Sequence, residues 1–223
     1  MITEDITNCV EILKAEELLG FPTETVYGLG ARADSPLAVK KIFKAKSRPN
    51  NHPLIVHGSS ASRVFECAKD IPEYAYVLAE AFWPGPMSLI LTKDSTKGMV
   101  CEETTGGQDS VAVRVPGHNV ALDLFSRCDF LVAGPSANQF SHVSPTSASH
   151  VVSEFGEELP VLDGGNCHVG VESTIISCLK SVPKILRTGS LTAAQVAQLL
   201  EIPEDDLSVR DLSKIKVSGN MKI

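Results

Sequence analysis

Strand-like and helix-like segments interleave along this chain, but several strands follow one another with no helix between them. Apolar patterns typical of strands occur at residues 21–27, 54–57, 87–92, 110–115, 130–133, 160–162, 173–178 and 183–186. Patterns typical of amphipathic helices occur at residues 5–19, 36–45, 60–69, 72–82, 120–128, 147–155 and 191–200. Neighbouring strands without a crossover helix favour a mixed sheet over a purely parallel one. The sequence therefore predicts an α/β fold.

Length and composition narrow the class of protein. The 223 residues suffice for one sizeable core or two small ones, and a hydrophobic content of 43% is ordinary for a globular protein. No apolar run approaches the roughly 18 residues that span a bilayer. The N-terminal residues 1–5 are acidic and lack the apolar stretch of a signal peptide. We therefore expect a cytoplasmic protein with no membrane partner.

The charges argue against a surface built for nucleic-acid backbones, because the net charge is −7. Five cations nevertheless cluster within nine positions. Lys40, Lys41 and Lys44 fit the solvated face of a helix, whereas Lys46 and Arg48 lie past the helical pattern and are expected in a loop. The six cysteines lack Cys-x-x-Cys spacing and the histidines form no metal-like pair, so we expect no protein metal site.

Four segments look unlike ordinary core sequence, namely residues 21–30, 46–49, 135–138 and 172–174. Each combines small hydroxyl side chains, glycines or cations. Hydroxyls and backbone amides can cradle phosphates, and Lys and Arg supply the opposite charge. These segments predict a nucleotide site that is assembled from distant parts of the chain.

The glycines in the first segment have two interpretations. Gly28 and Gly30 follow a predicted strand, as in a dinucleotide fingerprint, but Ala33 occupies the place of the third glycine and disfavours a Rossmann site. A tight turn after the strand is the other interpretation. Thr23 and Thr25 alternate beside it, and turn capping and ligand binding explain this pair equally well.

The remaining cations lie in a predicted loop or at predicted strands. If the chain is extended before Pro49, Lys46 and Arg48 point the same way and either hold an anion between them or are two solvated charges. Arg114 and Arg187 lie at otherwise apolar strands, where an Arg usually has an anionic partner. No Ser/His/Asp or Cys/His set emerges, so we expect catalysis by positioning and charge stabilisation.

These motifs, in this order, resemble the YrdC-type L-threonylcarbamoyladenylate synthase family. The resemblance runs from about residue 10 to about residue 200. It rests on residues 21–30, 46–56, 82–86, 111–116, 135–138, 144–146, 170–174 and 186–189.

The resemblance implies a twisted mixed sheet with flanking helices around a concave, positively charged cavity. The implied reaction joins ATP, L-threonine and bicarbonate into threonylcarbamoyl-AMP and pyrophosphate, the first step of t6A37 modification of tRNA. Mg²⁺ would accompany ATP, and the implied partners are the threonylcarbamoyl transferase machinery and tRNA or double-stranded RNA.

Matching the family motifs position by position assigns roles to individual residues. The implied threonine ligands are Thr25, His57, Arg114 and Ser173. The implied ATP ligands are Lys46, Arg48, His52, Ser110, Ser136, Asn138, Ser144 and Arg187. Within this set Lys46 and Arg48 would be catalytic, because they would neutralise the charge that develops on the phosphates.

The chain departs from the family pattern at three places. Ser47 stands where many members have Gly, and residues 139–142 replace a common Ser-Gly pair. Residues 217–222 resemble the start of the linker of two-domain members, so we expect a catalytic domain over residues 1–202 and a tail or linker over 203–223. Two other functions are alternatives. A YciO-like paralogue would match poorly at residues 135–138, and the net charge of −7 weakens a double-stranded RNA binding module.

Overall fold

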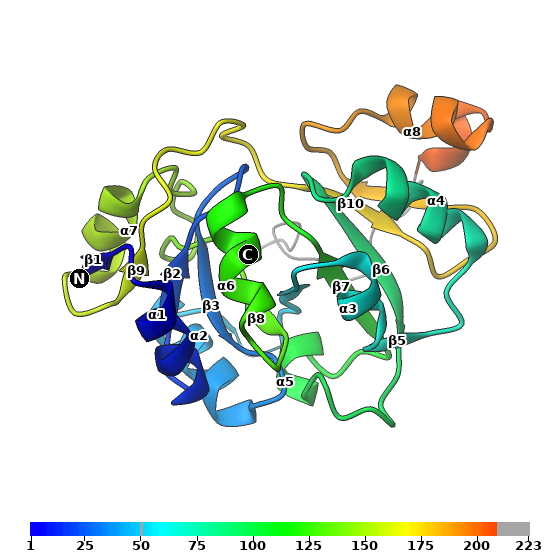
Figure 1. The fold of residues 1–223 in the computed structure, drawn as a ribbon. Helices are drawn as coiled ribbons and strands as arrows, with labels where there is room; N and C mark the ends of the chain where they lie inside the picture. Colours follow the sequence, from blue (N-terminus) through cyan, green and yellow to red (C-terminus); the bar gives the residue numbers. More distant parts are fainter. Residues whose placement is uncertain (50, 209–223) are drawn as a thin grey trace.

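A computed structural model describes residues 1–49 and 51–208, and within them eleven strands form one sheet (Figure 1). The strands are β1 (Ile2–Thr3), β2 (Leu19–Phe21), β3 (Gly28–Arg32), β4 (Ile55–His57), β5 (Ala68–Lys69), β6 (Met87–Lys93), β7 (Ser110–Arg114), β8 (Val132–Gly134), β9 (Val161–Leu162), β10 (Thr174–Ser177) and β11 (Lys184–Arg187). Their order is β1-β9-β2-β3-β8-β4-β7-β6-β10-β11, and β5 pairs with β6. Parallel pairs such as β4 with β7 stand beside antiparallel pairs such as β6 with β7, so the predicted mixed sheet is confirmed.

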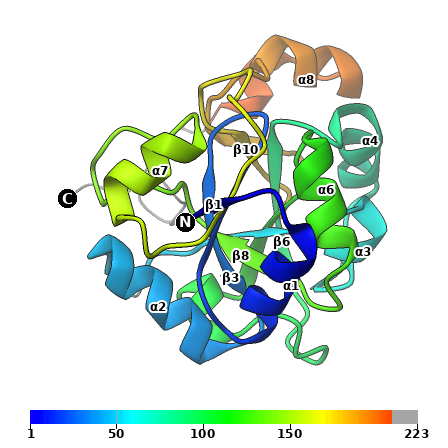
Figure 2. The ribbon, with the colours of Figure 1, turned by 60° about the vertical axis from the view of Figure 1, so that its left-hand side comes forward.

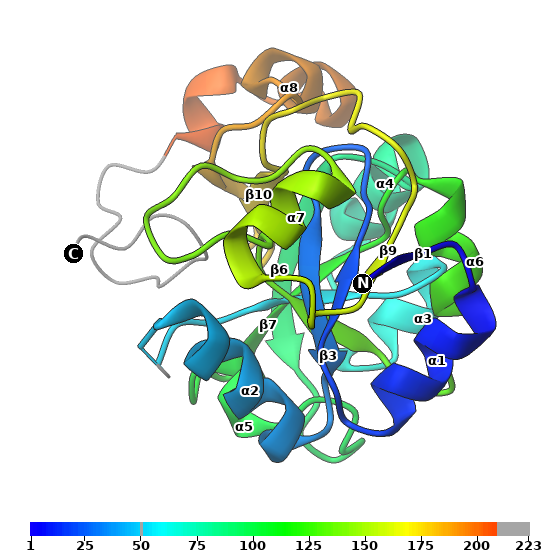
Figure 3. The same ribbon diagram turned by 90° about the vertical axis from the view of Figure 1, so that its left-hand side faces the viewer.

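Helices flank the sheet on both sides (Figures 2 and 3). They are α1 (Ile6–Lys14), α2 (Pro36–Lys46), α3 (Ala61–Phe65), α4 (Glu73–Phe82), α5 (Glu102–Thr105), α6 (Asn119–Ser126), α7 (Ala148–Phe155) and α8 (Ala193–Leu200), followed by the 3-10 turn η1 (Glu204–Leu207). The predicted start of α2 is confirmed. Pro36 occupies its first turn, and the Ser35 hydroxyl accepts a hydrogen bond of 3.1 Å from the Ala38 amide.

Several predicted boundaries are wrong. The predicted helix over residues 5–19 ends at Lys14, and Leu19–Phe21 forms strand β2 instead. Residues 22–27 make the turn, so Gly28 and Gly30 lie inside strand β3 and not in the turn itself. The predicted helix over 60–69 ends at Phe65, because Ala68–Lys69 adds a short strand beside β6.

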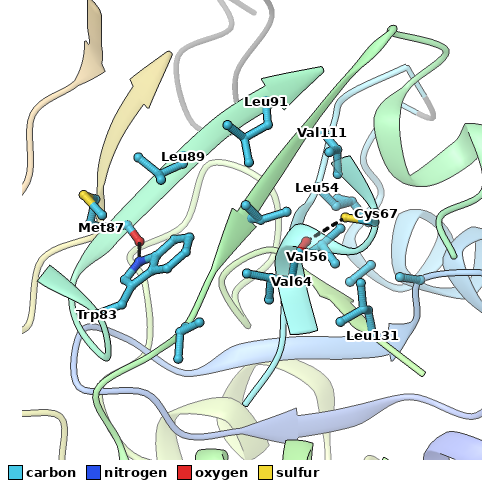
Figure 4. Packing of buried hydrophobic residues seen from close by; sticks show 14 of the residues in the cluster. Leu54, Val56, Val64, Cys67, Trp83, Met87, Leu89, Leu91, Val111 and Leu131 are labelled. Atoms are coloured by element: carbon cyan, nitrogen blue, oxygen red, sulfur yellow. Dashed lines mark hydrogen bonds between the residues drawn. The ribbon is translucent and has the colours of Figure 1, made fainter. Parts of the chain in front are cut away.

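The central strands bury one face in the main hydrophobic core. Leu89 and Leu91 of β6 and Val111 and Val113 of β7 belong to this core and are at most 1% exposed. Figure 4 shows Leu89, Leu91 and Val111 with Trp83, whose indole nitrogen donates to the Met87 carbonyl at 2.7 Å. Successive strand residues point to opposite faces, so Ser110, Ala112 and Arg114 face the other way.

A smaller core covers part of that other face. Helices α1 and α6 lie together across the front of β2, β3 and β8 in Figure 1, and their apolar residues pack around Phe21. The Phe21 ring needs the space that glycines leave. A Cβ on Gly28 would come within 2.3 Å of this ring, so a larger residue there would displace it. The rest of this face stays available for polar groups.

The described chain ends in a packed segment. Leu207 of η1 is 1% exposed and joins the main core, so packed structure continues beyond residue 202. Residues 209–223, which include the linker-like 217–222, lie outside the described part, and the domain boundary stays a prediction. No helix in the described ranges is both long enough and apolar enough to cross a membrane.

Candidate functional site

A pocket opens on the face of the sheet that the main core leaves uncovered, and its volume of about 370 Å³ includes space that is open to solvent. The four residues predicted to hold threonine all contribute to its wall: Thr25, His57, Arg114 and Ser173. Two predicted ATP ligands, Ser136 and Arg187, line the same pocket. The structure therefore brings these six residues together from six separate parts of the chain.

The turn before β3 supplies Thr23 and Thr25 with different roles. The Thr23 hydroxyl donates to the Val26 carbonyl at 2.6 Å and accepts from the amides of Thr25 and Val26, so it shapes the turn. The Thr25 hydroxyl lies 2.9 Å from that of Thr23 and also accepts from Arg114 Nη2 at 3.0 Å. Turn capping thus applies to Thr23, and both Thr23 and Thr25 line the pocket.

Arg114 is the last residue of strand β7 and is only 4% exposed. Three residues around it hold its guanidinium group in place. Its Nε donates to the Gly85 carbonyl at 3.3 Å, and its Nη2 contacts Thr25. Glu24 Oε1 lies 2.8 Å from the same Nη2, but neither Glu24 carboxylate oxygen has a well-aligned hydrogen bond to a described residue. The pair is therefore a charge contact and not a bidentate fork. The contacts of Arg114 with Gly85, Thr25 and Glu24 use its Nε and Nη2 atoms.

His57 lies beside Arg114, because β4 and β7 pair in register at these two residues. Its ring packs edge-on against Phe21 at 5.3 Å and stacks on Phe125 at 6.0 Å between centroids. Burial, with a further contribution from the Arg114 charge, lowers the pKa of His57 to about 3. His57 is therefore a neutral hydrogen-bonding group near neutral pH, and its Nδ1 has no partner among the described residues.

Ser173 connects the two halves of the predicted site. Its hydroxyl lies 2.8 Å from that of Ser88 on β6, which fixes it at the start of β10. Arg187 on β11 reaches back to Ser173 and donates to its carbonyl at 3.0 Å and to its hydroxyl at 3.1 Å. A predicted threonine ligand and a predicted ATP ligand are thus in direct contact.

Lys46 is not in a loop, contrary to the sequence prediction. It is the last residue of α2, and Ser47 ends that helix in the left-handed conformation with φ 51°. The Lys46 ammonium donates to the backbone carbonyls of Ser136, at 2.5 Å, and Asn138. Burial first and the Arg48 charge second lower the pKa of Lys46 to about 7. Lys46 therefore ties the end of α2 to the segment that carries two other predicted ATP ligands.

Arg48 is buried, so the alternative that Lys46 and Arg48 are two solvated charges is wrong. It is 9% exposed, and its Nη2 lies 3.4 Å from the Pro53 carbonyl. Burial lowers the pKa of Arg48 to about 10, while the Glu172 charge opposes this shift. A substitution of Arg48 is consequently expected to affect stability, because a buried charge with its contacts is more costly to remove than a surface one.

Neither Lys46 nor Arg48 lines the pocket, and the four remaining predicted ATP ligands also lie outside its wall. Asn138 is 6% exposed and donates to the carbonyls of Gln139 and His142. His52 packs edge-on against Phe140 at 5.8 Å. The Ser144 hydroxyl donates to Glu172 Oε1 at 3.1 Å. Ser110 lies at the other end of β7 from Arg114 and pairs with Thr92.

Sequence reasoning gave no role to the two carboxylates of the site. Glu24 contacts Arg114, and Glu172 contacts Arg187 and Ser144. Both belong to segments that the sequence had already singled out, residues 21–30 and 172–174. The sequence feature that could have identified them is an acidic residue directly next to residues that are expected to bind anions.

Two further observations concern metal ligands and thiols near the pocket. No three His, Cys, Asp or Glu side chains of the described ranges gather as they would around a metal ion. Cys167, in the loop beside the pocket, is half-buried, and burial raises the pKa of its thiol to about 11. A thiolate is therefore disfavoured there at neutral pH.

Comparison with known proteins gives this geometry a family context. The Sua5/YciO/YrdC family model, described as telomere recombination, matches residues 11–189. A threonylcarbamoyl-AMP synthase of Pyrococcus abyssi is 45% identical over 189 residues, which are 84% of this chain and 55% of that protein. One of Bacillus subtilis is 38% identical over 218 residues, 97% of this chain and 62% of that protein. The chain thus spans little more than half the length of these relatives.

Solved structures of two other proteins have the same fold as this chain. The crystal structure of Pyrococcus abyssi Sua5 complexed with L-threonine superposes with a TM-score of 0.88 and 40% identity, over 96% of this chain and 63% of that one. Escherichia coli YciO superposes with a TM-score of 0.74 over 86% of this chain and 92% of its own, but the identity is 16%. The likeness to YciO therefore concerns the fold alone.

Proposed function

The chain belongs to the Sua5/YciO/YrdC family, and we propose that it is a threonylcarbamoyl-AMP synthase. The proposed reaction converts ATP, L-threonine and bicarbonate into threonylcarbamoyl-AMP and pyrophosphate, as the first step of t6A37 modification of tRNA. The observation that carries the proposal is the convergence of Thr25, His57, Arg114 and Ser173 on one pocket. Relatives that are 38–45% identical to this chain over the aligned residues bear the corresponding name, which adds support.

The amino-acid side of the proposed site offers complementary groups for a zwitterion with a hydroxyl. Arg114 would bind the threonine carboxylate through its Nη1 edge, since its other edge is already held by Thr25 and Gly85. Thr25, Ser173 and neutral His57 supply short polar groups for the threonine hydroxyl. The apolar ring of Phe21 in the same wall would pack against the methyl group.

The nucleotide side supplies charge next to this pocket. Arg187 touches Ser173, and Lys46 holds the backbone of residues 136–138, so the phosphates would lie against the end of the threonine site. The threonine amine and bicarbonate form a carbamate with loss of water. The carbamate oxygen then attacks the α-phosphorus of ATP, and the bond to pyrophosphate breaks. Lys46, Arg48 and Arg187 would stabilise the negative charge that develops on the departing pyrophosphate.

Mg²⁺ fits this site only as a companion of ATP. Mg²⁺ usually keeps several waters and binds through phosphates and one or two carboxylates. Glu172 is the one acidic residue in the wall of the pocket, so the described side chains alone do not make a metal cage. Bound with ATP, the ion would neutralise phosphate charge and orient the leaving group. The cytoplasmic location and the contacts with transferase machinery or RNA stay predictions.

Direct detection of the product tests the proposal. The purified chain would be incubated with ATP, L-threonine and ¹³C-labelled bicarbonate, and the mixture would be analysed by mass spectrometry. We expect threonylcarbamoyl-AMP that carries one ¹³C atom. A reaction that yields only threonyl-AMP, or AMP without the label, would reject the proposed synthase.

A further inference from the structure

The Glu172 carboxylate lies among the residues that are predicted to bind the phosphates of ATP. Ser144 donates to its Oε1 at 3.1 Å, and Arg187 Nη1 contacts its Oε2. Glu172 also lines the pocket, and it is the only acidic side chain among the described residues of the pocket wall. A carboxylate therefore stands where the nucleotide is expected to bring a phosphate.

The surrounding cations respond to this charge. The Glu172 charge opposes the burial that lowers the pKa of Lys46, Arg48 and Arg187, so all three lie within its electrostatic reach. Each of these cations is mostly buried, and an uncompensated buried charge is costly. Glu172 consequently compensates the cationic cluster while no ligand is bound.

The position of Glu172 in the chain lets it leave this place easily. It belongs to the irregular segment between β9 and β10, and its side chain is 33% exposed. The next residue, Ser173, is 1% exposed and fixed by Ser88. The carboxylate can therefore turn out to solvent by side-chain rotation, while the backbone at Ser173 stays in place.

We infer that Glu172 is an internal counter-anion that a ligand polyphosphate must displace, and that it thereby sets the affinity of the nucleotide site. This inference rests on the proposed nucleotide site. The ligand gains contacts with Arg187 and Ser144 only as Glu172 gives them up, so the observed affinity is the difference between the two sets of contacts. Removal of the Glu172 charge should then tighten binding, whereas removal of a simple ligand-binding group would weaken it.

The experiment compares the parent chain with Glu172→Gln by calorimetric titration with inorganic tripolyphosphate and with ATP, in EDTA and at fixed ionic strength. Gln has the same shape and keeps hydrogen-bonding atoms but lacks the charge. We expect Kd to fall about three- to tenfold in the variant. A second variant, Glu172→Ala, should change Kd in the same direction. Thermal melting confirms that both variants are folded.

Glu154→Gln is the matched control, because it removes the same charge near Lys46 without touching the pocket wall. Glu154 accepts from the Gln139 amide at 2.8 Å and pairs with His142, contacts that Gln can retain in part. The control should change Kd less than twofold. Equal tightening in both variants would mean that only the long-range charge matters and would overturn the inference.

The other outcomes separate the inference from the function it rests on. If the parent binds ATP and Glu172→Gln binds it no tighter or more weakly, the counter-anion role is wrong while the nucleotide site stands. If neither the parent nor the variants bind ATP or tripolyphosphate, the nucleotide site itself is rejected and the inference with it.

Discussion

The two faces of the central sheet differ in what their side chains do, although the same strands supply both. On β7, Val111 and Val113 are buried in the main core, while Ser110 and Arg114, which alternate with them, lie on the face that holds the pocket. Neighbouring β4 repeats the division with Val56 and His57. Residues that stabilise the core and residues of the proposed site thus alternate along the same strand. Substitutions on the two faces should therefore have separable effects.

The largest expected effect concerns the polar groups of the pocket face. A site that hydrogen-bonds a substrate hydroxyl leaves its own groups unpaired when the hydroxyl is absent, which penalises the analogue by on the order of 10⁴-fold in kcat/KM. A methyl pocket discriminates by only about 1–3 kcal/mol. Serine should thus be a poor but detectable substrate, and valine and 2-aminobutyrate should be rejected more strongly. Better turnover with 2-aminobutyrate than with serine would show that methyl packing dominates.

The second prediction concerns the apolar face. Leu91 is fully buried in the main core, so Leu91→Ala should lower the free energy of unfolding by about 3–5 kcal/mol through lost burial and a cavity. Urea unfolding measures this loss. The folded variant should bind L-threonine as the parent does, because Leu91 points away from the pocket. A large change in threonine affinity would break the proposed separation of the faces.

The third prediction returns to the pocket face. Arg114→Lys keeps the positive charge but loses the planar fork that holds Gly85 and Thr25 and is proposed to receive the carboxylate. The Kd for L-threonine should rise roughly 10- to 100-fold. Calorimetric titration gives this value directly, and the ATP affinity of the same variant is the control. Equal threonine affinity in variant and parent would remove Arg114 from the site.

The fourth prediction uses the pKa of Lys46, which burial lowers to about 7 from its ordinary value of 10.5. Phosphates nearby favour the charged ammonium, so ATP binding should take up a proton above pH 7 and weaken by up to tenfold per pH unit. In the unfolded chain Lys46 has its ordinary pKa, so it keeps its proton up to about pH 10.5, whereas the folded chain loses this proton near pH 7. Lys46 therefore makes the free energy of unfolding rise with pH between about 7 and 10.5. Calorimetry in buffers of different ionisation enthalpy measures the uptake. Lys46→Arg should abolish it, and uptake that persists in this variant would belong to another group.

The smallest expected effect lies between the two regions, at the end of α2. Ser47 has a φ of 51°, a conformation that costs a residue with a side chain more than it costs Gly. Ser47→Gly should therefore raise the free energy of unfolding by about 0.5–1 kcal/mol and leave the ATP affinity unchanged. Thermal melting and titration test both parts. A destabilised variant would show that the Ser47 side chain contributes contacts that outweigh its backbone strain.

The apolar face could be predicted from the sequence because its signals are local. Val111 and Val113 alternate with smaller or polar residues, and Ser35 with Pro36 marks the start of a helix whatever lies around it. Strand β3 escaped prediction because Gly28 and Gly30 read as a turn. Their role depends on the Phe21 ring, which contacts them only in the folded sheet.

The pocket face was predictable as a set of residues but not as an arrangement. Thr25, His57, Arg114 and Ser173 were expected from motif order, and the fold brings them together. The burial of Arg48 and the backbone contacts of Lys46 depend on tertiary packing, which spacing does not reveal. The place of Glu172 depends on the crossing of an irregular segment in front of Arg187, for which the sequence has no local signal.

Pyrophosphate release from ATP by the purified chain tests the central claim most directly. The proposed pocket joins a threonine site to a nucleotide site through the contact of Ser173 with Arg187, so cleavage of ATP should depend on both substrates. We expect rapid release only when L-threonine and bicarbonate are both present, and a much slower release with Arg114→Lys at the same threonine concentration. Release at the same rate with and without threonine would contradict the account.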